Sequence, residues 1–273
     1  MKKHVLTLLT TLLPMVAMVT LLGACGEDDK EDNNGGGVTI KDKHISKIVE
    51  ETNGTIRERV FTYDSKGRIT TMETTVNSPS ESSVYKRTYQ YSETTIIERN
   101  ESNNTLSPYD SALHTYELED GKIVLDTETK DGNSVYYHIA YDTDGYIREI
   151  FDYVDVDNDR LFLHSARSVN WKNGNLKSAV YRGVEVPYWE NTNLPWTIGT
   201  FIDINTSIIP DTDPILFATG FYGKMPRNIP SIAGDVSYEY TITAGMLTNV
   251  KKKVVDPYGE RDAEISIYNI SWE

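Results

Sequence analysis

Hydrophobic and polar residues alternate with a period of two along much of the chain beyond about residue 40. Tyr85, Arg87, Tyr89 and Tyr91 share one face of a predicted strand, and the opposite face is polar. The same alternation recurs at residues 135–141 and 238–242, as expected for strands with one buried face. Outside the N-terminal apolar segment, no long stretch has the apolar spacing of an amphipathic helix. We therefore predict an all-β protein whose Tyr-rich face points inward and whose Thr, Lys and Glu face points to solvent.

One turn pattern recurs between these strands. Residues 63–69 read Tyr-Asp-Ser-Lys-Gly-Arg-Ile, in which Asp begins a hairpin turn and Gly adopts a positive φ. Complete or degenerate copies lie at residues 91–96, 118–123, 141–147, 171–176 and 243–247. A spacing of roughly 24 to 29 residues corresponds to two strands per unit. The pattern predicts a large antiparallel meander of about a dozen strands, curled into a half-pipe or barrel-like shape.

A proline-rich and aromatic insertion interrupts the pattern at about residues 183–235. It contains most of the chain's ten prolines and shows little alternation. A segment of this length is expected to pack or to function, so we predict that it covers the concave side of the sheet. Its aromatic rings either bury against the Tyr face as a plug or stay exposed in part as a platform for a ligand. The candidate ligand-binding residues are Tyr188, Trp189, Trp196, Phe221 and Tyr222.

The N-terminus has the pattern of a lipoprotein signal peptide. Lys2 and Lys3 precede an apolar stretch, and small residues lead into Cys25, which is the chain's one cysteine. We predict cleavage of residues 1–24 and attachment to a membrane through lipid on Cys25. An uncleaved transmembrane anchor is the alternative, but Pro14 and the acidic segment that follows make it a poor stop-transfer helix.

Residues 25–39 predict a disordered acidic tether, and residues 40–273 predict a single β domain that contains the insertion. The acidic cluster behind Cys25 resembles the surface-export signal of Bacteroidetes lipoproteins. This resemblance implies an outer-membrane lipoprotein that is exposed at the cell surface. A generic linker on a periplasm-facing protein is the alternative.

The formal net charge of −14 argues against nucleic acid as a partner. No motif for nucleophilic catalysis is present, so the sequence predicts no enzyme. The candidate metal ligands are Asp155, Asp157 and Asp159, whose alternating carboxylates suit calcium. The alternative is a polar hairpin turn that binds no metal, and no other cofactor is expected.

Residues 220–231 and the following Tyr238-Glu239-Tyr240 carry a family resemblance. They resemble the Gly-x-x-Gly-Lys-x-x-x-Asn-Leu-Pro-Ser segment and Tyr-x-Tyr strand of a Bacteroides-type lipoprotein family of unknown function, although Ile229 stands in place of Leu. The hairpins also resemble the tyrosine-aspartate repeats of bacterial surface proteins. The resemblance implies a porin-like fold in the cell envelope and assigns no catalytic residue.

These features favour a non-catalytic, lipid-anchored module that binds a glycan or a protein, or that has a structural role. One alternative is a hydrolase acting on polysaccharide, which requires a pair of inward carboxylates in a cleft. Another is a carrier that holds an apolar ligand inside the curled sheet, which requires a cavity that the insertion does not fill.

Overall fold

Antiparallel strands make up most of the residues described by the structure, which is a computed structural model. The described parts all belong to one compact unit, Val38–Glu273, and comprise residues 43–103, 112–155, 161–181, 184–186, 189–195, 212–233, 235–255 and 263–273. They form 17 strands and one short helix, α1, at Pro214–Ala218.

The first eleven strands are β1 (Ile45–Thr52), β2 (Thr55–Tyr63), β3 (Ile69–Asn77), β4 (Ser82–Tyr91), β5 (Thr95–Ser102), β6 (Leu113–Glu119), β7 (Lys122–Lys130), β8 (Asn133–Tyr141), β9 (Ile147–Asp155), β10 (Leu161–Lys172) and β11 (Asn175–Tyr181). The remaining six are β12 (Val184–Val186), β13 (Trp189–Pro195), β14 (Asn228–Ala233), β15 (Val236–Thr243), β16 (Met246–Val254) and β17 (Glu264–Trp272).

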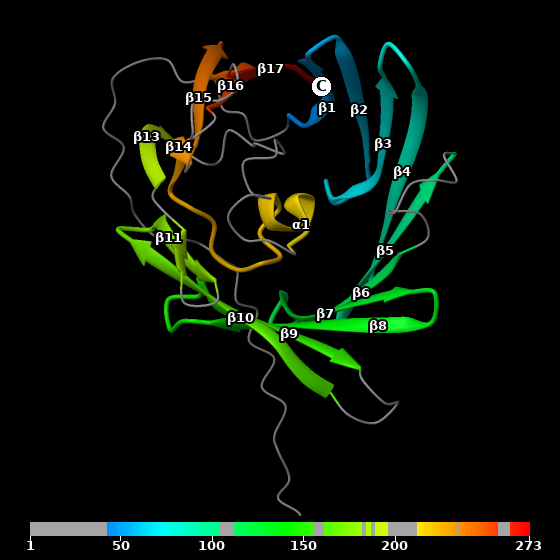
Figure 1. Ribbon diagram of the computed structural model, residues 1–273, viewed down its shortest axis with the longest axis vertical. Coiled ribbons are helices and arrows are strands. Elements are labelled where there is room, and N and C mark those ends of the chain that lie inside the picture. The colour runs from blue at the N-terminus through cyan, green and yellow to red at the C-terminus, as the bar shows by residue number, and fades with distance from the viewer. Residues whose placement is uncertain are drawn as a thin grey trace, which may run out of the picture. The chain divides into compact units, whose positions relative to one another are not determined.

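Apart from β12 and β13, consecutive strands of the described chain pair with each other, so the sheet is a meander. Antiparallel pairs run in sequence from β1 to β12 and from β13 to β17. β17 then pairs with β1, which joins the two series. Figure 1 shows the strands curling around α1. The predicted curled antiparallel meander is therefore confirmed, with more strands than the dozen expected.

The hairpin turns follow the predicted chemistry. Asp64 Oδ1 accepts hydrogen bonds from the amides of Lys66 and Arg68, and Asp142 Oδ1 accepts in the same way from Asp144 and Tyr146. Other turns consist of two residues that both have positive φ, which is the type I′ geometry that twists with the strands. These turns are Asn53-Gly54, Asp120-Gly121, Asp131-Gly132, Asn173-Gly174 and Ala244-Gly245.

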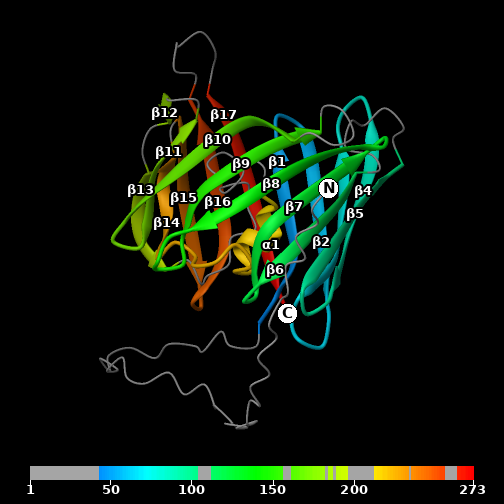
Figure 2. The ribbon, with the colours of Figure 1, turned by 90° about the horizontal axis from the view of Figure 1, so that it is seen from below.

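The turns define the two ends of the curled sheet. The near end carries the turns at residues 64–68, 92–94, 120–121, 142–146, 173–174 and 244–245, whereas the far end carries those at 53–54, 78–81 and 131–132. The chain enters the sheet at the near end, where the amide of His44 donates to the carbonyl of Glu273 at 3.0 Å. Figure 2 shows the C-terminus at this end.

Apolar residues that begin strands at the near end form one layer of the core. They are Ile69, Ile96, Ile123, Ile147, Leu176 and Leu247, all at most 2% exposed. The predicted inward Tyr face is also confirmed, because Tyr89 and Tyr238 are 3% and 5% exposed.

An aromatic side chain near the end of a strand donates to a carbonyl of an earlier strand at the near end. Tyr91 Oη donates to the Ile69 carbonyl at 2.7 Å, and Trp171 Nε1 donates to the Ile147 carbonyl at the same distance. The further members of this aromatic ladder are Tyr63 to Ile45, Tyr141 to Ile123, Tyr240 to Pro230 and Trp272 to Leu247. Each step of the ladder adds a side-chain hydrogen bond between two strands that are already paired in the sheet.

Within the described part of the insertion, the segment from residue 212 to 227 packs inside the curl, as predicted, but the rest is more regular than its sequence suggests. The insertion supplies β12, β13 and β14 to the sheet as well as α1, which lies in the interior (Figures 1 and 2). Ile215, Leu216 and Phe217 of α1 are at most 3% exposed. We call the segment from Thr212 to Arg227 the plug.

Candidate functional site

The plug binds the near end of the sheet through its backbone. Three successive hairpins each exchange one hydrogen bond with it, at a spacing of three residues along the plug. These bonds run from the Ile123 amide to the Phe221 carbonyl, from the Lys224 amide to the Gly145 carbonyl and from the Arg227 amide to the Gly174 carbonyl, each at 2.8 Å. The family-like segment at residues 220–231 is therefore the part of the insertion that closes the near end.

The interior changes character toward the far end. Along β5 the inward side chains pass from Ile96 to Glu98, and along β9 from Ile150 to Asp152. Buried charges are unfavourable unless they are paired and hydrogen-bonded, so each of these residues requires partners. The buried charged residues of the described chain are Glu50, Glu98, Asp126, Asp152, Arg167 and Asp213.

The plug leaves this polar half of the interior hollow. We call three linked hollows of about 440, 240 and 250 Å³ the far-end cavity. The first and second share Arg87, Asn100 and Pro214, and the first and third share Arg57. Because Pro214 begins α1, the plug forms part of the cavity wall. The lining of the first hollow also includes the exposed Glu101, so this hollow reaches the surface.

Two arginines of β2 converge on one carboxylate beside the first hollow. Arg57 Nη1 and Arg59 Nη2 donate to the same Glu50 Oε2 at 2.8 and 2.9 Å, and Tyr268 Oη donates to Glu50 Oε1 at 3.3 Å. Burial raises the pKa of Glu50, but Arg59 and Arg57 outweigh it and hold the pKa below its ordinary value. Glu50 is therefore ionised and fixes both guanidinium groups in place.

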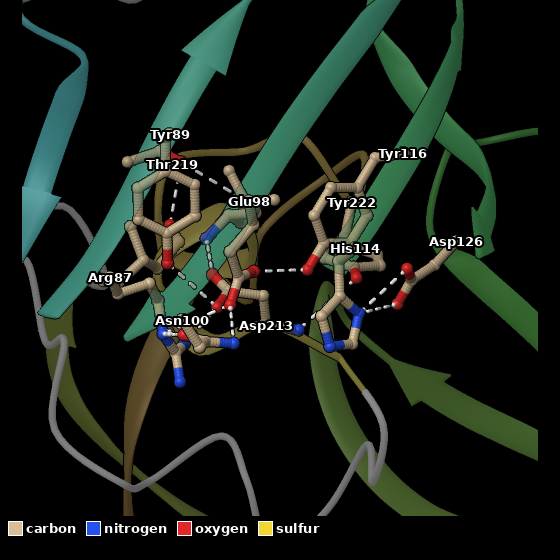
Figure 3. Close-up of polar contacts among 12 residues, drawn as sticks. Arg87, Tyr89, Glu98, Asn100, His114, Tyr116, Asp126, Asp213, Thr219 and Tyr222 are labelled. Carbon is tan, nitrogen blue, oxygen red and sulfur yellow. Dashed lines mark hydrogen bonds and ion pairs between the residues drawn. The ribbon is translucent and has the colours of Figure 1, made fainter. Parts of the chain in front are cut away.

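A second carboxylate, Glu98, lines the second hollow, and Figure 3 shows its polar contacts. Tyr116 Oη donates to its Oε2 at 2.6 Å, and Asn100 Nδ2 donates to its Oε1 at 3.1 Å. Arg87 Nε lies 3.2 Å from Oε1. Although burial raises the pKa of Glu98, Arg87 and then His114 lower it below the ordinary value. The carboxylate is charged and saturated with donors.

The plug contributes Asp213 to the same network. Asp213 Oδ2 accepts from Arg87 Nη1 and, at 3.0 Å, from Tyr89 Oη, while Oδ1 caps α1 by accepting from the Leu216 amide at 2.7 Å. Burial, followed by the nearby charge of Glu98, raises the pKa of Asp213 to about 6 although Arg87 opposes the rise. One side chain thus fixes both the start of α1 and its contact with β4.

His114 and Asp126 form an ion pair in the second hollow. His114 Nδ1 lies 3.1 Å from Asp126 Oδ1. Burial lowers the pKa of His114, but the hydrogen bond and charge of Asp126 and the charge of Glu98 raise it to about 9. Burial raises the pKa of Asp126 to about 6 against the effect of His114. Both groups are consequently charged at neutral pH.

The first hollow has the mixed lining that is typical of small-molecule sites. Met72, Val76 and Ile215 supply apolar surface, and Arg57 and Arg59 supply cationic donors. The second hollow is more polar, and its lining includes Glu98, His114, Asp126 and Asp213 of the network in Figure 3. Together they offer space, apolar contact and oriented charge.

Two of the predicted ligand-binding rings belong to the plug. Tyr222 is 1% exposed, and its hydroxyl accepts from the Asp213 amide at 3.3 Å. Phe221 is half-buried and stacks on Tyr91 with ring centroids 5.7 Å apart. Neither ring forms an exposed platform. The side chains of Tyr188, Trp189 and Trp196 lie outside the described part of the chain.

The predicted lipidation and metal sites are also outside the described residues. Cys25, Asp157 and Asp159 fall in undescribed segments, and the side chain of Asp155 is not described although its backbone ends β9. Within the described ranges, no three His, Cys, Asp or Glu side chains are grouped to hold a metal ion. The described ranges also contain no helix of the length and apolar character needed to cross a membrane.

Of the inward charges, only Arg87 was placed on the inward Tyr face by the sequence alternation, and the others were not predicted. Arg87 lies between Tyr85 and Tyr89 at the strand period, so the same alternation that turns the tyrosines inward also turns Arg87 inward. Asp213 is different, because its place beside Arg87 depends on how the insertion folds back. That contact spans 126 residues of sequence.

The fold and the cavity define a class: an all-β protein whose curled antiparallel meander is plugged at one end and hollow at the other. The chain belongs to the family described as "Domain of unknown function (DUF4595) with porin-like fold", whose match covers residues 61–255.

Two solved structures share the fold. One is described as a porin-like protein from Bacteroides uniformis ATCC 8492 and has a TM-score of 0.64 at 17% identity over 84% of this chain and 98% of that chain. The other is a porin-like protein from Bacteroides vulgatus ATCC 8482, with a TM-score of 0.55 at 14% identity over 85% of this chain and 99% of that chain. No curated protein matches the chain.

Proposed function

We propose that this protein is a non-catalytic, lipid-anchored protein of the cell envelope that holds a small ligand in the far-end cavity. The observation that carries the proposal is the position of the plug, which fills the near end and leaves a hollow of about 440 Å³ beyond it. A packed interior would have left no room for a ligand. The hypothesis of a carrier requires a cavity that the insertion does not fill, and this hollow supports it.

The place where the chain enters the sheet supports the proposal of a lipid-anchored protein that holds a ligand. The described chain begins beside His44 at the near end, whereas the cavity lies toward the far end. A tether to lipidated Cys25 would therefore attach to the plugged end and leave the cavity on the opposite end of the domain. The acidic segment behind Cys25 and the Bacteroides origin of the solved porin-like proteins agree with an outer-membrane, surface-exposed location.

Blocking the cavity tests the proposal. Val76 lines the first hollow, so Val76→Trp should fill the space, whereas the neighbouring Thr75 points to the other face of β3 and Thr75→Trp serves as the matched control. We expect the uncharged dye Nile red to bind the wild type and Thr75→Trp, and to lose binding in Val76→Trp. Equal binding by all three proteins, or no binding by the wild type, would reject a ligand-holding cavity.

The anchor has its own test. Cys25→Ala should abolish labelling of the protein by an alkyne analogue of palmitate and move it from the membrane fraction to the soluble fraction. Wild-type protein that takes up no label would contradict lipidation. Digestion of intact cells with proteinase K then separates a surface location, where the protein is cleaved, from a periplasm-facing one, where it is protected.

A second candidate, a polysaccharide hydrolase, rests on the carboxyl groups of the second hollow. Asp126 has a pKa of about 6, whereas the pKa of Glu98 is lowered, and carboxyl groups with separated pKa values are used as acid and base in glycoside hydrolysis. Turnover of a dye-labelled polysaccharide that Glu98→Gln abolishes would support this candidate. The hydrogen bonds that saturate Glu98 favour the structural role instead.

Recognition of a glycan through exposed rings remains a further proposal for Tyr188, Trp189 and Trp196. A glycan array read with wild-type protein and with Trp196→Ala tests it independently of the cavity. Calcium at Asp155, Asp157 and Asp159 is tested by the change in thermal midpoint when calcium is added to metal-free protein.

A further inference from the structure

The inward cations of the first hollow outnumber its inward anions. Arg57, Arg59 and Arg87 line it, and the one carboxylate in its described lining, Glu101, is an exposed residue. Because Asn100 and Ser102 of β5 are the inward residues on either side, Glu101 belongs to the outer face of that strand. A ligand in this hollow therefore meets guanidinium groups rather than carboxylates.

Buried carboxylates hold the guanidinium groups of these arginines in place. Glu50 binds Arg57 and Arg59 through one oxygen. Arg87 is held by two carboxylates, Glu98 and Asp213. The side chains of Arg57, Arg59 and Arg87 keep 37%, 12% and 28% of their surface exposed. Preoriented arginines with accessible surface are well suited to bind an anionic group.

Part of the remaining wall is apolar. Met72 and Val76 of β3 and Pro214 and Ile215 of the plug line the same hollow, together with the polar residues Thr74, Tyr85, Lys86, Asn100 and Ser102. An anion without an apolar body would leave the apolar side chains in contact with water, and a polyanion would be opposed by the chain's net charge of −14. The lining selects for one anionic group attached to an apolar body.

We infer that the first hollow binds an amphipathic monoanion, with the anionic group on Arg57 and Arg59 and the apolar body against Met72, Val76 and Ile215. This inference rests on the proposed function and names the class of ligand. A carboxylate and a sulfate satisfy the same donors, so the shared chemistry is a singly charged oxyanion on an apolar chain.

Three ligands with the same chain separate the contribution of the head group from that of the apolar body. Calorimetric titration measures the affinity for decanoate, decanol and decyltrimethylammonium, which carry an anionic, a neutral and a cationic head group on the same alkyl chain. We expect decanoate to bind about tenfold more tightly than decanol, the difference of one charge-assisted contact, and the ammonium to bind most weakly. Equal affinities for the three would overturn this inference while leaving the ligand-holding cavity intact. No binding by any of them, together with no binding of Nile red, would reject the proposed function itself.

Variants of the arginine cluster provide the second arm. Arg57→Gln should weaken decanoate binding about tenfold without changing decanol binding, and Arg59 remains to pair with Glu50. Arg148→Gln, which removes an exposed arginine with 58% of its side-chain surface accessible, is the matched control and should change neither affinity. Loss of decanol binding in Arg57→Gln would show a general structural defect and count against a head-group role.

Removal of the internal carboxylate gives the sharpest outcome. Glu50→Gln keeps a hydrogen-bond acceptor for the arginines but removes the charge that competes with the ligand. We expect decanoate to bind several-fold more tightly to Glu50→Gln and decanol to bind as before. Unchanged or weaker binding of decanoate by a variant with native circular dichroism would overturn the inference.

Discussion

Gly223 occupies a position in the plug where no side chain fits. A β-carbon there would lie 2.8 Å from the Tyr141 ring and would overlap the Gly145 carbonyl, which also accepts a hydrogen bond from the Lys224 amide. The residue has a φ of +83°. Its contact with the turn explains why a glycine begins the Gly-Lys pair of the family-like segment.

Gly223→Ala should lower the free energy of unfolding by about 3 kcal/mol, because left-handed strain and overpacking against backbone act together. Gly121→Ala is the control, since Gly121 has a φ of +75° and nothing lies within 4 Å of its added β-carbon. It should cost only about 1 kcal/mol from strain. Urea denaturation measures both, and equal losses would contradict tight docking of the plug.

His114 makes stability depend on pH. Its pKa is raised from 6.5 to about 9 in the folded protein, so its stabilising contribution is complete below pH 6.5 and is lost as the pH rises through 9. Asp126, Glu98 and Glu128 surround it with negative charge. Between pH 6.5 and 9 we expect a loss on the order of 3 kcal/mol from this group.

His114→Asn should flatten that part of the pH profile, measured by urea unfolding at a series of pH values. The same change at His138, an exposed residue of β8, should leave the slope in place. A wild-type profile as flat as that of His114→Asn would show that the ion pair with Asp126 contributes nothing to stability.

At the scale of the strands, the aromatic ladder stabilises the near end. Tyr141→Phe removes the hydrogen bond to the Ile123 carbonyl and should reduce the free energy of unfolding by about 1 kcal/mol. Tyr153 of β9 is a control, because its hydroxyl has no hydrogen-bond partner among the described residues, and Tyr153→Phe should be close to neutral. Thermal unfolding distinguishes the two. If Tyr141→Phe leaves the stability unchanged, this hydrogen bond of the ladder contributes no free energy to the fold.

Local patterns predicted the strands well because they depend on neighbouring residues. The alternation at Tyr85 to Tyr91 and the Asp–Gly turns identified hairpins, and each hairpin formed where the turn chemistry placed it. The strands within the insertion were missed, since β12 has three residues and β14 contains Pro230. Such strands exist because the sheet edge beside them is already formed, which is tertiary information.

The candidate site was predicted less well than the fold. Aromatic residues of the insertion suggested a platform, yet Tyr222 is in the core. The arginines and carboxylates that line the cavity are spread from Glu50 to Asp213. Apart from the strand alternation at Arg87, nothing local distinguishes them from the many solvated charges of an acidic chain. The pairing of Arg87 with Asp213 requires the plug to fold into the curl before either partner is recognisable.

At the scale of the whole molecule, the interior is divided along the axis of the curl. Apolar strand starts and the plug occupy the near end, and paired charges with open space occupy the far end. The stabilising core and the candidate site are therefore separate regions of one interior. This separation is why changes such as Val76→Trp or Arg57→Gln can be tested against a fold that rests on the other end.

The sheet depends on strands that lie outside the family match at residues 61–255. β17 pairs with both β16 and β1, Tyr268 is fully buried, and Trp272 Nε1 donates to the Leu247 carbonyl at 2.7 Å. Deletion of residues 264–273 would expose two strand edges and remove a step of the aromatic ladder at once. We expect the truncated protein to lose its cooperative urea transition and its near-ultraviolet circular dichroism.

Deletion of residues 1–42 is the matched control, because it removes more residues but no described strand, and it should leave the midpoint of unfolding unchanged. A truncated protein without residues 264–273 that still unfolds cooperatively at the wild-type midpoint would show that the sheet is stable without the β17–β1 pairing. The pairing of β17 with β1 would then contribute nothing to the free energy of unfolding. The stability of the curled sheet would have to come from the plug.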